Sequence, residues 1–296
     1  MKNNQRLQFL IIFLVFVICV ISVTFVNRTF VREETLHGMD VAREQPDRFG
    51  EGYIEVNAEV IHVDPISSRM VLELNFIPHG RFDTGAGVLS TPLEIDVSDV
   101  NGDPILFMAG RRMSAHEAVM DMHEGQVDDY PFDRHRALVE ILVLEKSGEA
   151  WKPIPAQLDF QGDYHGFAFH DAVIPDNDSD YFGVDVHLER SPLVRWTAIF
   201  CMTIMWSLTA VNLFMLWAVL TRRLEVDFGL FGYMSGFLVA MYFFRQILPD
   251  IPPFIGVYAD YLAFFWVELI AAGISIVFAV VWFRKSIGTD LTARKP

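Results

Sequence analysis

The sequence predicts a membrane protein with four transmembrane α-helices, arranged one plus three, and an all-β, sandwich-like domain outside the membrane. Two observations support this fold class. Apolar residues gather in four runs, each long enough to cross a hydrocarbon core of about 30 Å, although the whole chain is only 52% hydrophobic. Between the first and second runs the composition is instead that of a soluble domain, with short alternating segments separated by turn residues.

The first apolar run is residues 7–26, which contain no charged side chain. A cleaved signal peptide is the alternative interpretation, but its apolar core usually has about 7–15 residues, and no clean A-x-A cleavage site follows this run. We therefore expect an uncleaved transmembrane helix after a cytoplasmic N-terminus at residues 1–6. Residues 27–52 are polar and aperiodic, and we expect them to form a stalk.

The β domain is expected over residues 53–192. Residues 53–63 and 70–77 alternate apolar and polar side chains, which is the pattern of half-buried strands, and the turn at Asp64-Pro65 joins them into a hairpin. Short segments between Gly-rich and Asp-rich turns predict further strands at 92–98, 104–109, 136–144, 155–160, 166–173 and 181–188.

One segment of this domain predicts a helix instead. Residues 114–122 (SAHEAVMDM) begin with Ser114, a favourable N-cap, and place Glu117 at the capping-box position.

Three closely spaced transmembrane helices are expected at residues 194–220, 228–248 and 257–283, followed by a cytoplasmic tail at 284–296. Lys and Arg in short flanking segments mark the cytoplasmic side of a membrane. Such residues occur at both ends of the chain and between the second and third apolar runs: Lys2, Arg6, Arg222, Arg223, Arg284, Lys285, Arg294 and Lys295. We therefore expect both termini in the cytoplasm of a multi-pass cell-membrane protein.

The charge is concentrated in the expected outer domain. Residues 27–192 contain 32 acidic and 13 basic residues, a net charge of −19, whereas the whole chain carries −15. A negative field of this kind disfavours nucleic acid and anionic lipid, and favours cations or a basic protein partner. A well-solvated surface is the plainer interpretation.

A proline–aromatic turn is expected at Tyr130-Pro131-Phe132-Asp133. Proline fixes the backbone, and the Asp carboxylate can accept backbone hydrogen bonds in a turn. The plain interpretation is a structural turn. The functional interpretation is a contact that couples the outer domain to the membrane helices.

Ionisable side chains inside a membrane are costly and therefore indicate function. Arg245 and Asp260 each lie about three residues below the outer end of a predicted helix, roughly 5 Å deep, and we expect them to pair. Glu268 lies near the midplane, either protonated and hydrogen-bonded to a neighbouring helix or acting in a proton or cation relay. Hydroxyl groups at similar depth are those of Thr203, Ser207 and Ser235.

The nine histidines all lie in the expected outer domain, where they could titrate as a pH sensor. His165 and His170 are weak metal-ligand candidates, because no pair shows the spacing of a zinc motif. Residues 176–180 open like a calcium loop, with Asp176, Asp178 and Asp180 as weak candidates, but Tyr181 stands where an EF-hand needs Gly. We expect no metal site.

No motif of a known enzyme class is present. The sequence lacks G-x-S-x-G, P-loop, C-x-x-C and dinucleotide-binding fingerprints. We therefore expect neither an enzymatic activity nor a cofactor.

Three segments carry a family resemblance: Gly110–Ser114 followed by YPFDRH at 130–135, RQILPDIPP at 245–253, and GVYADY at 256–261 continuing to FWVE at 265–268. Together with the one-plus-three layout, they resemble a bacterial membrane family catalogued as domain of unknown function 4436. The resemblance covers nearly the whole chain. It implies a cell-membrane protein of actinobacterial type and implies no activity.

A fainter resemblance is to pentameric ligand-gated ion channels. YPFDRHRALVEILVL (130–144) is similar to their membrane-facing turn, and LP…IPPFIGVY (248–258) to the linker after their pore-lining helix. This resemblance implies that residues 194–220, 228–248 and 257–283 correspond to the first three channel helices. The chain departs from that pattern, since it lacks the fourth helix and the flanking cysteine pair and adds an N-terminal anchor.

The leading functional hypothesis is a non-enzymatic module of the cell envelope, embedded in membrane lipid, whose acidic outer domain binds a basic protein partner or cations. One alternative is a pH- or ligand-responsive, channel-like protein. Another is a small transporter or proton relay that uses Glu268. Assembly into a homo-oligomer is left open.

Overall fold

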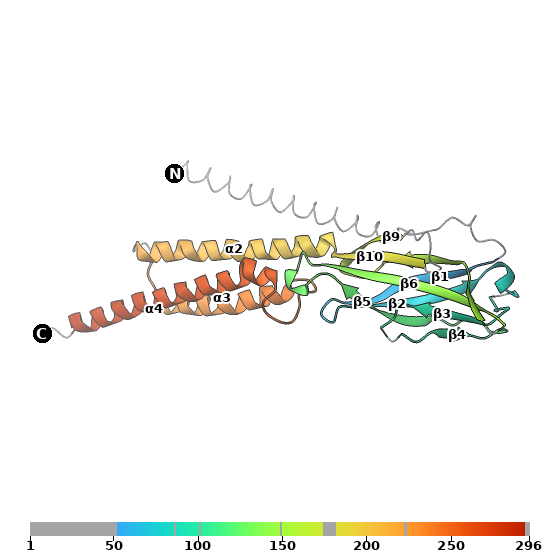
Figure 1. The fold of residues 1–296 in the computed structure, drawn as a ribbon. Helices are drawn as coiled ribbons and strands as arrows, with labels where there is room; N and C mark the ends of the chain where they lie inside the picture. Colours follow the sequence, from blue (N-terminus) through green and yellow to red (C-terminus); the bar gives the residue numbers. More distant parts are fainter. Residues whose placement is uncertain are drawn as a thin grey trace, which may run out of the picture. The chain divides into compact units, whose positions relative to one another are not determined.

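The structure, a computed structural model, describes residues 52–85, 87–100, 102–148, 150–173, 182–221 and 224–293. These residues form two compact units (Figure 1). The β unit contains the described residues up to Gln126 and Arg134–Leu193, and the helical unit contains Val127–Asp133 together with the described residues from Val194 onward. The predicted first helix at 7–26, nearly all of the stalk at 27–52, and Asp176, Asp178 and Asp180 lie outside the described residues.

The described part of the β unit contains one mixed sheet of ten strands. The main path runs β4-β3-β6-β5-β2-β1-β8, while β10 pairs with β6 and β9, and β7 pairs with β6. The β1–β8 pair is parallel and the others are antiparallel. The strands are β1 Ile54–Asp64, β2 Arg69–Pro78, β3 Leu93–Val97, β4 Ile105–Phe107, β5 His116–His123, β6 Arg134–Ser147, β7 Ala150–Pro153, β8 Ala156–Gln161, β9 Phe167–Val173 and β10 Phe182–Arg190.

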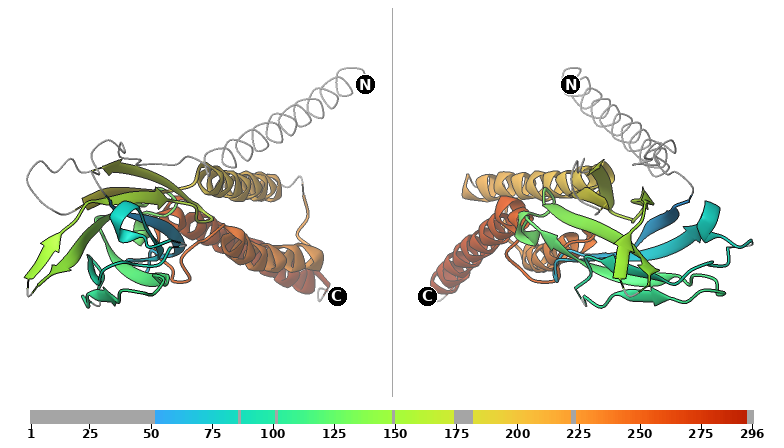
Figure 2. Two further views of the ribbon diagram at one scale, coloured as in Figure 1. Left: turned by 90° about the vertical axis from the view of Figure 1, so that its right-hand side faces the viewer. Right: turned by 45° about the vertical axis from the view of Figure 1, so that its right-hand side comes forward.

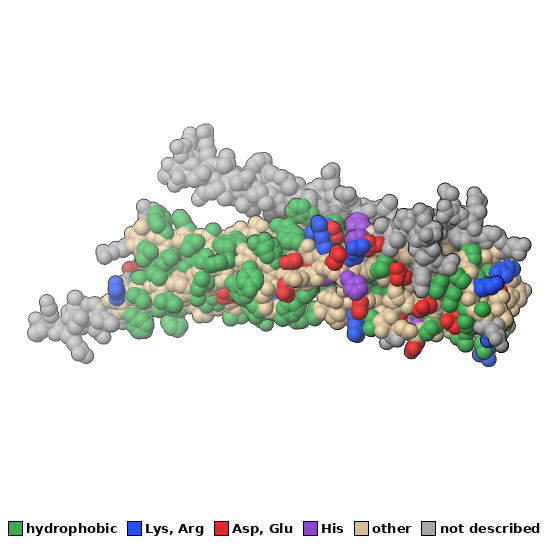
Figure 3. Space-filling model, viewed as in Figure 1, with side chains coloured by type: hydrophobic (Ala, Val, Ile, Leu, Met, Phe, Trp, Pro, Cys, Tyr) green, Lys and Arg blue, Asp and Glu red, His purple; other side chains and the backbone are tan. Residues whose placement is uncertain are grey.

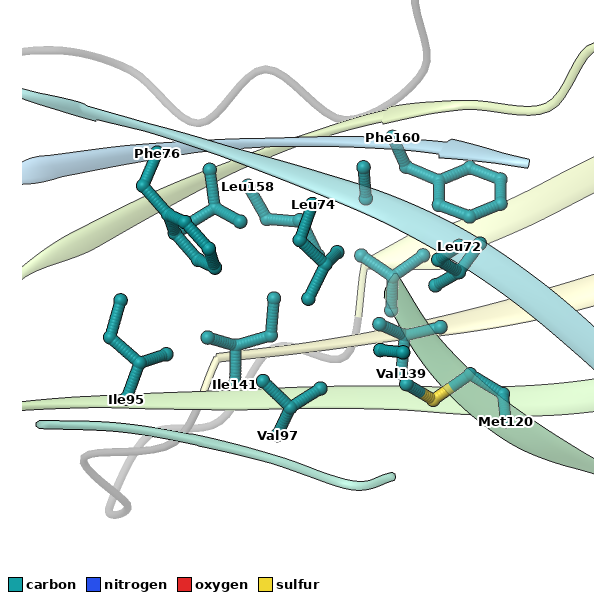
Figure 4. Packing of buried hydrophobic residues seen from close by; sticks show 14 of the residues in the cluster. Leu72, Leu74, Phe76, Ile95, Val97, Met120, Val139, Ile141, Leu158 and Phe160 are labelled. Atoms are coloured by element: carbon teal, nitrogen blue, oxygen red, sulfur yellow. The ribbon is translucent and has the colours of Figure 1, made fainter. Parts of the chain in front are cut away.

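The sheet curves so that one face encloses the hydrophobic core. The alternating residues of β1 and β2 that the sequence marks as apolar are buried, because successive side chains of a strand point to opposite faces. In Figure 4, side chains of β2 and β8 face those of β3, β5 and β6: Leu72, Leu74, Phe76, Leu158 and Phe160 on one side, and Ile95, Val97, Met120, Val139 and Ile141 on the other. Burial of each large apolar side chain stabilises the unit by about 1.5–3 kcal/mol.

The predicted helix at residues 114–122 is wrong, because His116–His123 form strand β5. Ala118, Met120 and Met122 repeat with a period of two and are buried, and β5 pairs with both β2 and β6. Burial of this alternating face outweighs the local capping signal. Strand β7, at Ala150–Pro153, was not predicted from the sequence either.

Three apolar helices follow the β unit, and each is long and apolar enough to cross a membrane: Pro192–Leu220, Phe228–Ile247 and Asp260–Arg284. They are α2 (Pro192–Leu220), α3 (Phe228–Ile247), and the π-helical turn η4 (Asp260–Phe264) continued by α4 (Phe265–Ala293). The coarse prediction of a β domain followed by three apolar helices is therefore confirmed. The carboxylate of Asp227 caps α3 by accepting a hydrogen bond from the backbone N–H of Leu230 at 3.0 Å.

In the helical unit, α3 and α4 lie side by side (Figures 1 and 2). Their buried faces share a cluster with α2 that contains Met205, Met234, Met241, Val267, Ala271 and Phe278. The opposite helix faces expose large apolar side chains, among them Phe214, Leu269 and Ile276. On the face seen in Figure 3, hydrophobic side chains cover much of the helical unit, and most of the visible charged side chains lie on the β unit.

Candidate functional site

The segment between β5 and β6 belongs to the helical unit and binds the connection between α3 and α4 at two points. Tyr130 is fully buried in the helical cluster. Its hydroxyl donates a hydrogen bond to the carbonyl of Pro249 at 2.5 Å, and its own carbonyl accepts one from the backbone N–H of Ala259 at 3.1 Å. The Phe132 ring, 42% exposed, meets the ring of Tyr258 edge-on at 6.3 Å between centroids. Pro131 and Asp133 are buried.

The ion pair expected from the sequence is present between Arg245 and Asp260. The Nε of Arg245 donates to Oδ1 of Asp260 at 2.7 Å, and Nη2 donates to Oδ2 at 3.0 Å. Both side chains are buried, with exposures of 0% and 1%. Removing one partner of a buried pair typically costs about 3–5 kcal/mol, because the other charge is left uncompensated.

Three backbone groups of the α3–α4 connection also bond to this ion pair. Nη2 of Arg245 also donates to the carbonyl of Phe254 at 2.8 Å, and Oδ2 of Asp260 accepts from the N–H groups of Gly256 and Val257 at 2.8 and 3.3 Å. Gly256 has φ of 119°, which favours glycine, so its N–H can point toward the carboxylate. The pair therefore fixes the connection that Tyr130 contacts.

Helix α2 is bound to the same region by a contact that the sequence did not predict. The indole Nε1 of Trp206 donates to the carbonyl of Leu262 at 3.1 Å, within the π-helical turn. A π turn disturbs the regular i→i−4 hydrogen-bond pattern of a helix, so an external donor stabilises it. A polar aromatic residue in the middle of an apolar helix was the only sequence signal for this contact.

Among the described residues, Glu268 makes no hydrogen bond to a neighbouring helix, and its predicted role stays a prediction. It is half-buried on α4 and has no hydrogen-bond or ion-pair partner among the described residues. The hydroxyls of Thr203 and Ser207 donate to carbonyls within α2, those of Ile199 and Thr203. Ser235 is exposed on α3. No described hydrogen bond therefore joins Glu268 to these hydroxyl groups.

Three glutamates form a row across the outward face of the β unit, which we call the glutamate row. Glu59 of β1 lies directly opposite Glu73 of β2, which lies directly opposite Glu117 of β5. Residues opposite each other on adjacent strands have Cβ atoms about 4.5–5.5 Å apart, and like charges there are destabilising. None of the three carboxylates has an ion-pair partner among the described residues, so the row is a concentrated, unneutralised negative site.

A second cross-strand row contains three histidines and an arginine. His170 of β9 lies opposite His187 of β10, His187 lies opposite Arg136 of β6, and Arg136 lies opposite His123 of β5. The three histidines are exposed. This arrangement separates the predicted metal candidates, since His165 lies in the turn before β9 while His170 lies within it. Within the described ranges, no three His, Cys, Asp or Glu side chains are grouped to hold a metal ion.

Asp185 of β10 neutralises the arginine of this row. Nε and Nη2 of Arg136 donate to its two carboxylate oxygens at 2.7 and 2.6 Å. The hydrogen bonds from Arg136 hold the pKa of Asp185 below its usual value, and the nearby His187 lowers it further, while partial burial opposes both. Asp185 is therefore ionised at neutral pH, with its Oδ2 3.5 Å from Nε2 of His187.

Comparison with family models divides the chain near the end of β10. Residues 44–188 match the family described as Domain of unknown function (DUF4436), and residues 190–285 match Domain of unknown function (DUF8686). No curated protein matches the chain. The first match covers the strands of the β unit, and the second covers the three apolar helices. The chain therefore carries the domain of unknown function DUF4436 at residues 44–188, followed by the domain of unknown function DUF8686.

Proposed function

We propose that the protein is a multi-pass protein of the cell membrane whose acidic β unit, on the outer side, binds a basic protein partner. In this proposal α2, α3 and η4–α4 cross the bilayer, residues 7–26 add a fourth crossing, and both termini are cytoplasmic. The apolar outer faces of the helices support a lipid environment. Exposed aromatic residues near the helix ends do so too, because Trp and Tyr favour membrane interfaces: Trp196, Trp217, Tyr258 and Tyr261.

The observation that carries the proposed activity is the glutamate row. Glu59 and Glu117 are exposed and Glu73 is half-buried, so a partner can reach all three carboxylates from one side. Repulsion among them is relieved when a positive group binds. A Lys- or Arg-rich segment supplies several positive groups at once, and the acidic domain steers it toward the row. Free cations are the alternative occupant.

The test uses the full-length protein in lipid nanodiscs and a lysine decapeptide as probe. Glu59→Gln, Glu73→Gln and Glu117→Gln together remove three charges from the row. The matched control removes three acidic charges elsewhere, with Glu94→Gln, Asp96→Asn and Asp103→Asn. We expect the first variant to lose affinity about tenfold or more, equal to about 1.4 kcal/mol, and the control to lose much less. Equal losses in both variants would show that only net charge matters and would contradict the proposal.

Calcium separates the two kinds of occupant. If the row is a cation site, Ca²⁺ alone will bind to the wild type with measurable heat and will compete with the peptide far below the concentration needed for general salt screening. If the row binds a basic segment, Ca²⁺ will act only as other salts do at equal ionic strength.

A second candidate function is a pH- or ligand-responsive, channel-like protein, and the contacts of Tyr130 favour it. A change in the strands that flank residues 127–133 could act directly on the α3–α4 connection through the Pro249 and Ala259 hydrogen bonds. The mass of the purified protein in detergent tests this candidate. A ring of several copies is required, because three helices of one chain enclose no lumen, so a monomer would rule it out.

A further inference from the structure

We propose that His170 and His187 together form a binding site for a divalent transition-metal ion such as Zn²⁺, Ni²⁺ or Cu²⁺. The two residues lie directly opposite each other on the antiparallel strands β9 and β10, so their side chains project from the same face. Both are exposed, which leaves their rings accessible to an ion from solution. They lie on consecutive strands, and the register of those strands makes them direct neighbours.

The spacing of the pair suits shared coordination. Cβ atoms of opposite residues lie about 4.5–5.5 Å apart. Two imidazole nitrogens that bind one tetrahedral ion at about 2.0–2.1 Å need to approach to about 3.3 Å. Rotation about the side-chain bonds brings the rings that close, and the strands hold the two backbones in place. Neutral imidazole is a preferred ligand of zinc, copper and nickel, and water completes the coordination at an exposed site.

Asp185 provides the outer contact that a ligating histidine commonly has. Its Oδ2 lies 3.5 Å from Nε2 of His187, and its position is fixed by the two hydrogen bonds from Arg136. A carboxylate near Nε2 favours the tautomer with the proton on that nitrogen, which leaves the lone pair of Nδ1 for the metal. The same hydrogen bonds neutralise Arg136, the cation that would otherwise repel a metal ion from His187.

The pair differs from the metal site considered from the sequence. The sequence suggests His165 and His170 as a pair because they are close along the chain. In the structure His165 lies in the turn before β9, outside the cross-strand row of His170, His187, Arg136 and His123. The inferred site has two protein ligands, because no third His, Cys, Asp or Glu among the described residues joins them. We therefore expect weaker binding than at a structural zinc site with three or four protein ligands.

The experiment is calorimetric titration of the full-length protein, without a polyhistidine tag, with Zn²⁺ alone in a non-coordinating buffer. His170→Gln and His187→Gln remove one ligand each. His123→Gln and His165→Gln are matched controls, since His123 lies in the same row but opposite Arg136. We expect one equivalent of Zn²⁺ on the wild type, a loss of affinity of about tenfold or more in either ligand variant, and little change in the controls.

Two further readouts keep the result interpretable. Circular dichroism and thermal unfolding without metal are expected to match among all variants, because the altered side chains are exposed. Zn²⁺ affinity of the wild type is expected to be lower in acid than at neutral pH, because protons compete with the metal for the imidazole nitrogens. Zn²⁺ binding that persists in both ligand variants, or that is lost equally in His123→Gln, would overturn the proposal.

Discussion

The Tyr130 hydroxyl, from the segment between β5 and β6, donates a hydrogen bond to the carbonyl of Pro249 just beyond the end of α3. The backbone carbonyl of the same residue binds Ala259, immediately before η4. One buried residue thus contacts the connection between two apolar helices near its start and near its end. Any movement of that connection relative to the Tyr130 segment must break at least one of these hydrogen bonds.

Two replacements of Tyr130 should destabilise the helical unit to different extents. Tyr130→Phe leaves the partly buried carbonyl of Pro249 without this donor and should lower the free energy of unfolding by about 1–2 kcal/mol. Tyr130→Ala also removes a large buried ring and should cost about 3–5 kcal/mol. Unfolding in detergent mixtures, followed by tryptophan fluorescence, measures both values. Tyr233→Phe is the control, because that side chain is exposed; a loss as large as that of Tyr130→Phe would refute the importance of the Pro249 contact.

The Arg245–Asp260 pair should show strong coupling. Arg245→Leu or Asp260→Leu alone should each lower the free energy of unfolding by about 3–5 kcal/mol, because a buried charge remains without its partner. The double replacement should cost less than the sum of the single ones, since no unpaired charge remains. A double-mutant cycle in the unfolding assay gives this coupling, with the exposed Arg284→Leu as control. Strictly additive losses would contradict a direct pair.

Glu268→Gln should leave the fold nearly unchanged. The carboxyl group makes no hydrogen bond with a described residue, and Gln has almost the same shape, so the free energy of unfolding should change by about 0.5 kcal/mol or less. Proteoliposomes with an internal pH dye then test the relay hypothesis separately. If Glu268 carries protons, the variant should dissipate a pH gradient more slowly than the wild type; equal rates would remove the relay from consideration.

The hairpin between β1 and β2 should lose stability in acid through Asp64. The Ser67 hydroxyl donates to its carboxylate at 2.7 Å, and this bond lowers the pKa of Asp64 below its usual value, helped by the backbone N–H groups of Ser67 and Ile66 and opposed by slight burial. A lowered folded-state pKa stabilises the protein above the ordinary carboxyl pKa, and this stabilisation is lost as the pH falls through the lowered value.

Ser67→Ala tests this pH dependence. The variant should raise the pKa of Asp64 toward its ordinary value and cost about 0.5–1 kcal/mol at neutral pH, where the hydrogen bond is charge-assisted. Between neutral and acidic pH, the difference from the wild type should shrink as the pH falls through the lowered pKa of Asp64, because the carboxyl then becomes protonated in both proteins. Denaturant unfolding at neutral and acidic pH provides the measurement, with the exposed Ser147→Ala as control. If the difference in the free energy of unfolding between Ser67→Ala and the wild type were independent of pH, the ionised carboxylate of Asp64 would not be its cause, and the prediction would be wrong.

Local sequence patterns were sufficient to predict those helices and strands whose characteristic residues all lie within one short segment. The β1–β2 hairpin follows from alternation around Asp64-Pro65, and α2 and α3 begin and end close to the predicted residues, whereas α4 continues to Ala293, beyond the predicted end at residue 283. The Arg245–Asp260 pair could be predicted as well, because both residues lie at adjoining ends of two consecutive helices, joined by a short connection.

The features that escaped prediction depend on pairing between distant strands. The capping signal at Ser114 predicted a helix where strand β5 forms. The alternating face of β5 is stabilised by its pairing with β2 and β6, which the local sequence does not indicate. The glutamate row and the His170–His187 pair exist because of strand register, and a shift of one residue would move each side chain to the other face. A single sequence does not specify that register, so these sites could be identified only in the folded β unit.

The central claim is the membrane topology: the β unit lies outside the cell and the C-terminus lies in the cytoplasm. The most direct test measures the accessibility of one site in each of these two parts in intact cells. The variant carries Asp103→Cys at an exposed position of the β unit, together with Cys19→Ser and Cys201→Ser, and a protease-sensitive epitope after Pro296. Intact cells are treated with a membrane-impermeant thiol reagent and, separately, with a protease. The account predicts labelling of position 103 and protection of the epitope until the cells are permeabilised. An unlabelled position 103, or an epitope cleaved from outside, would contradict it.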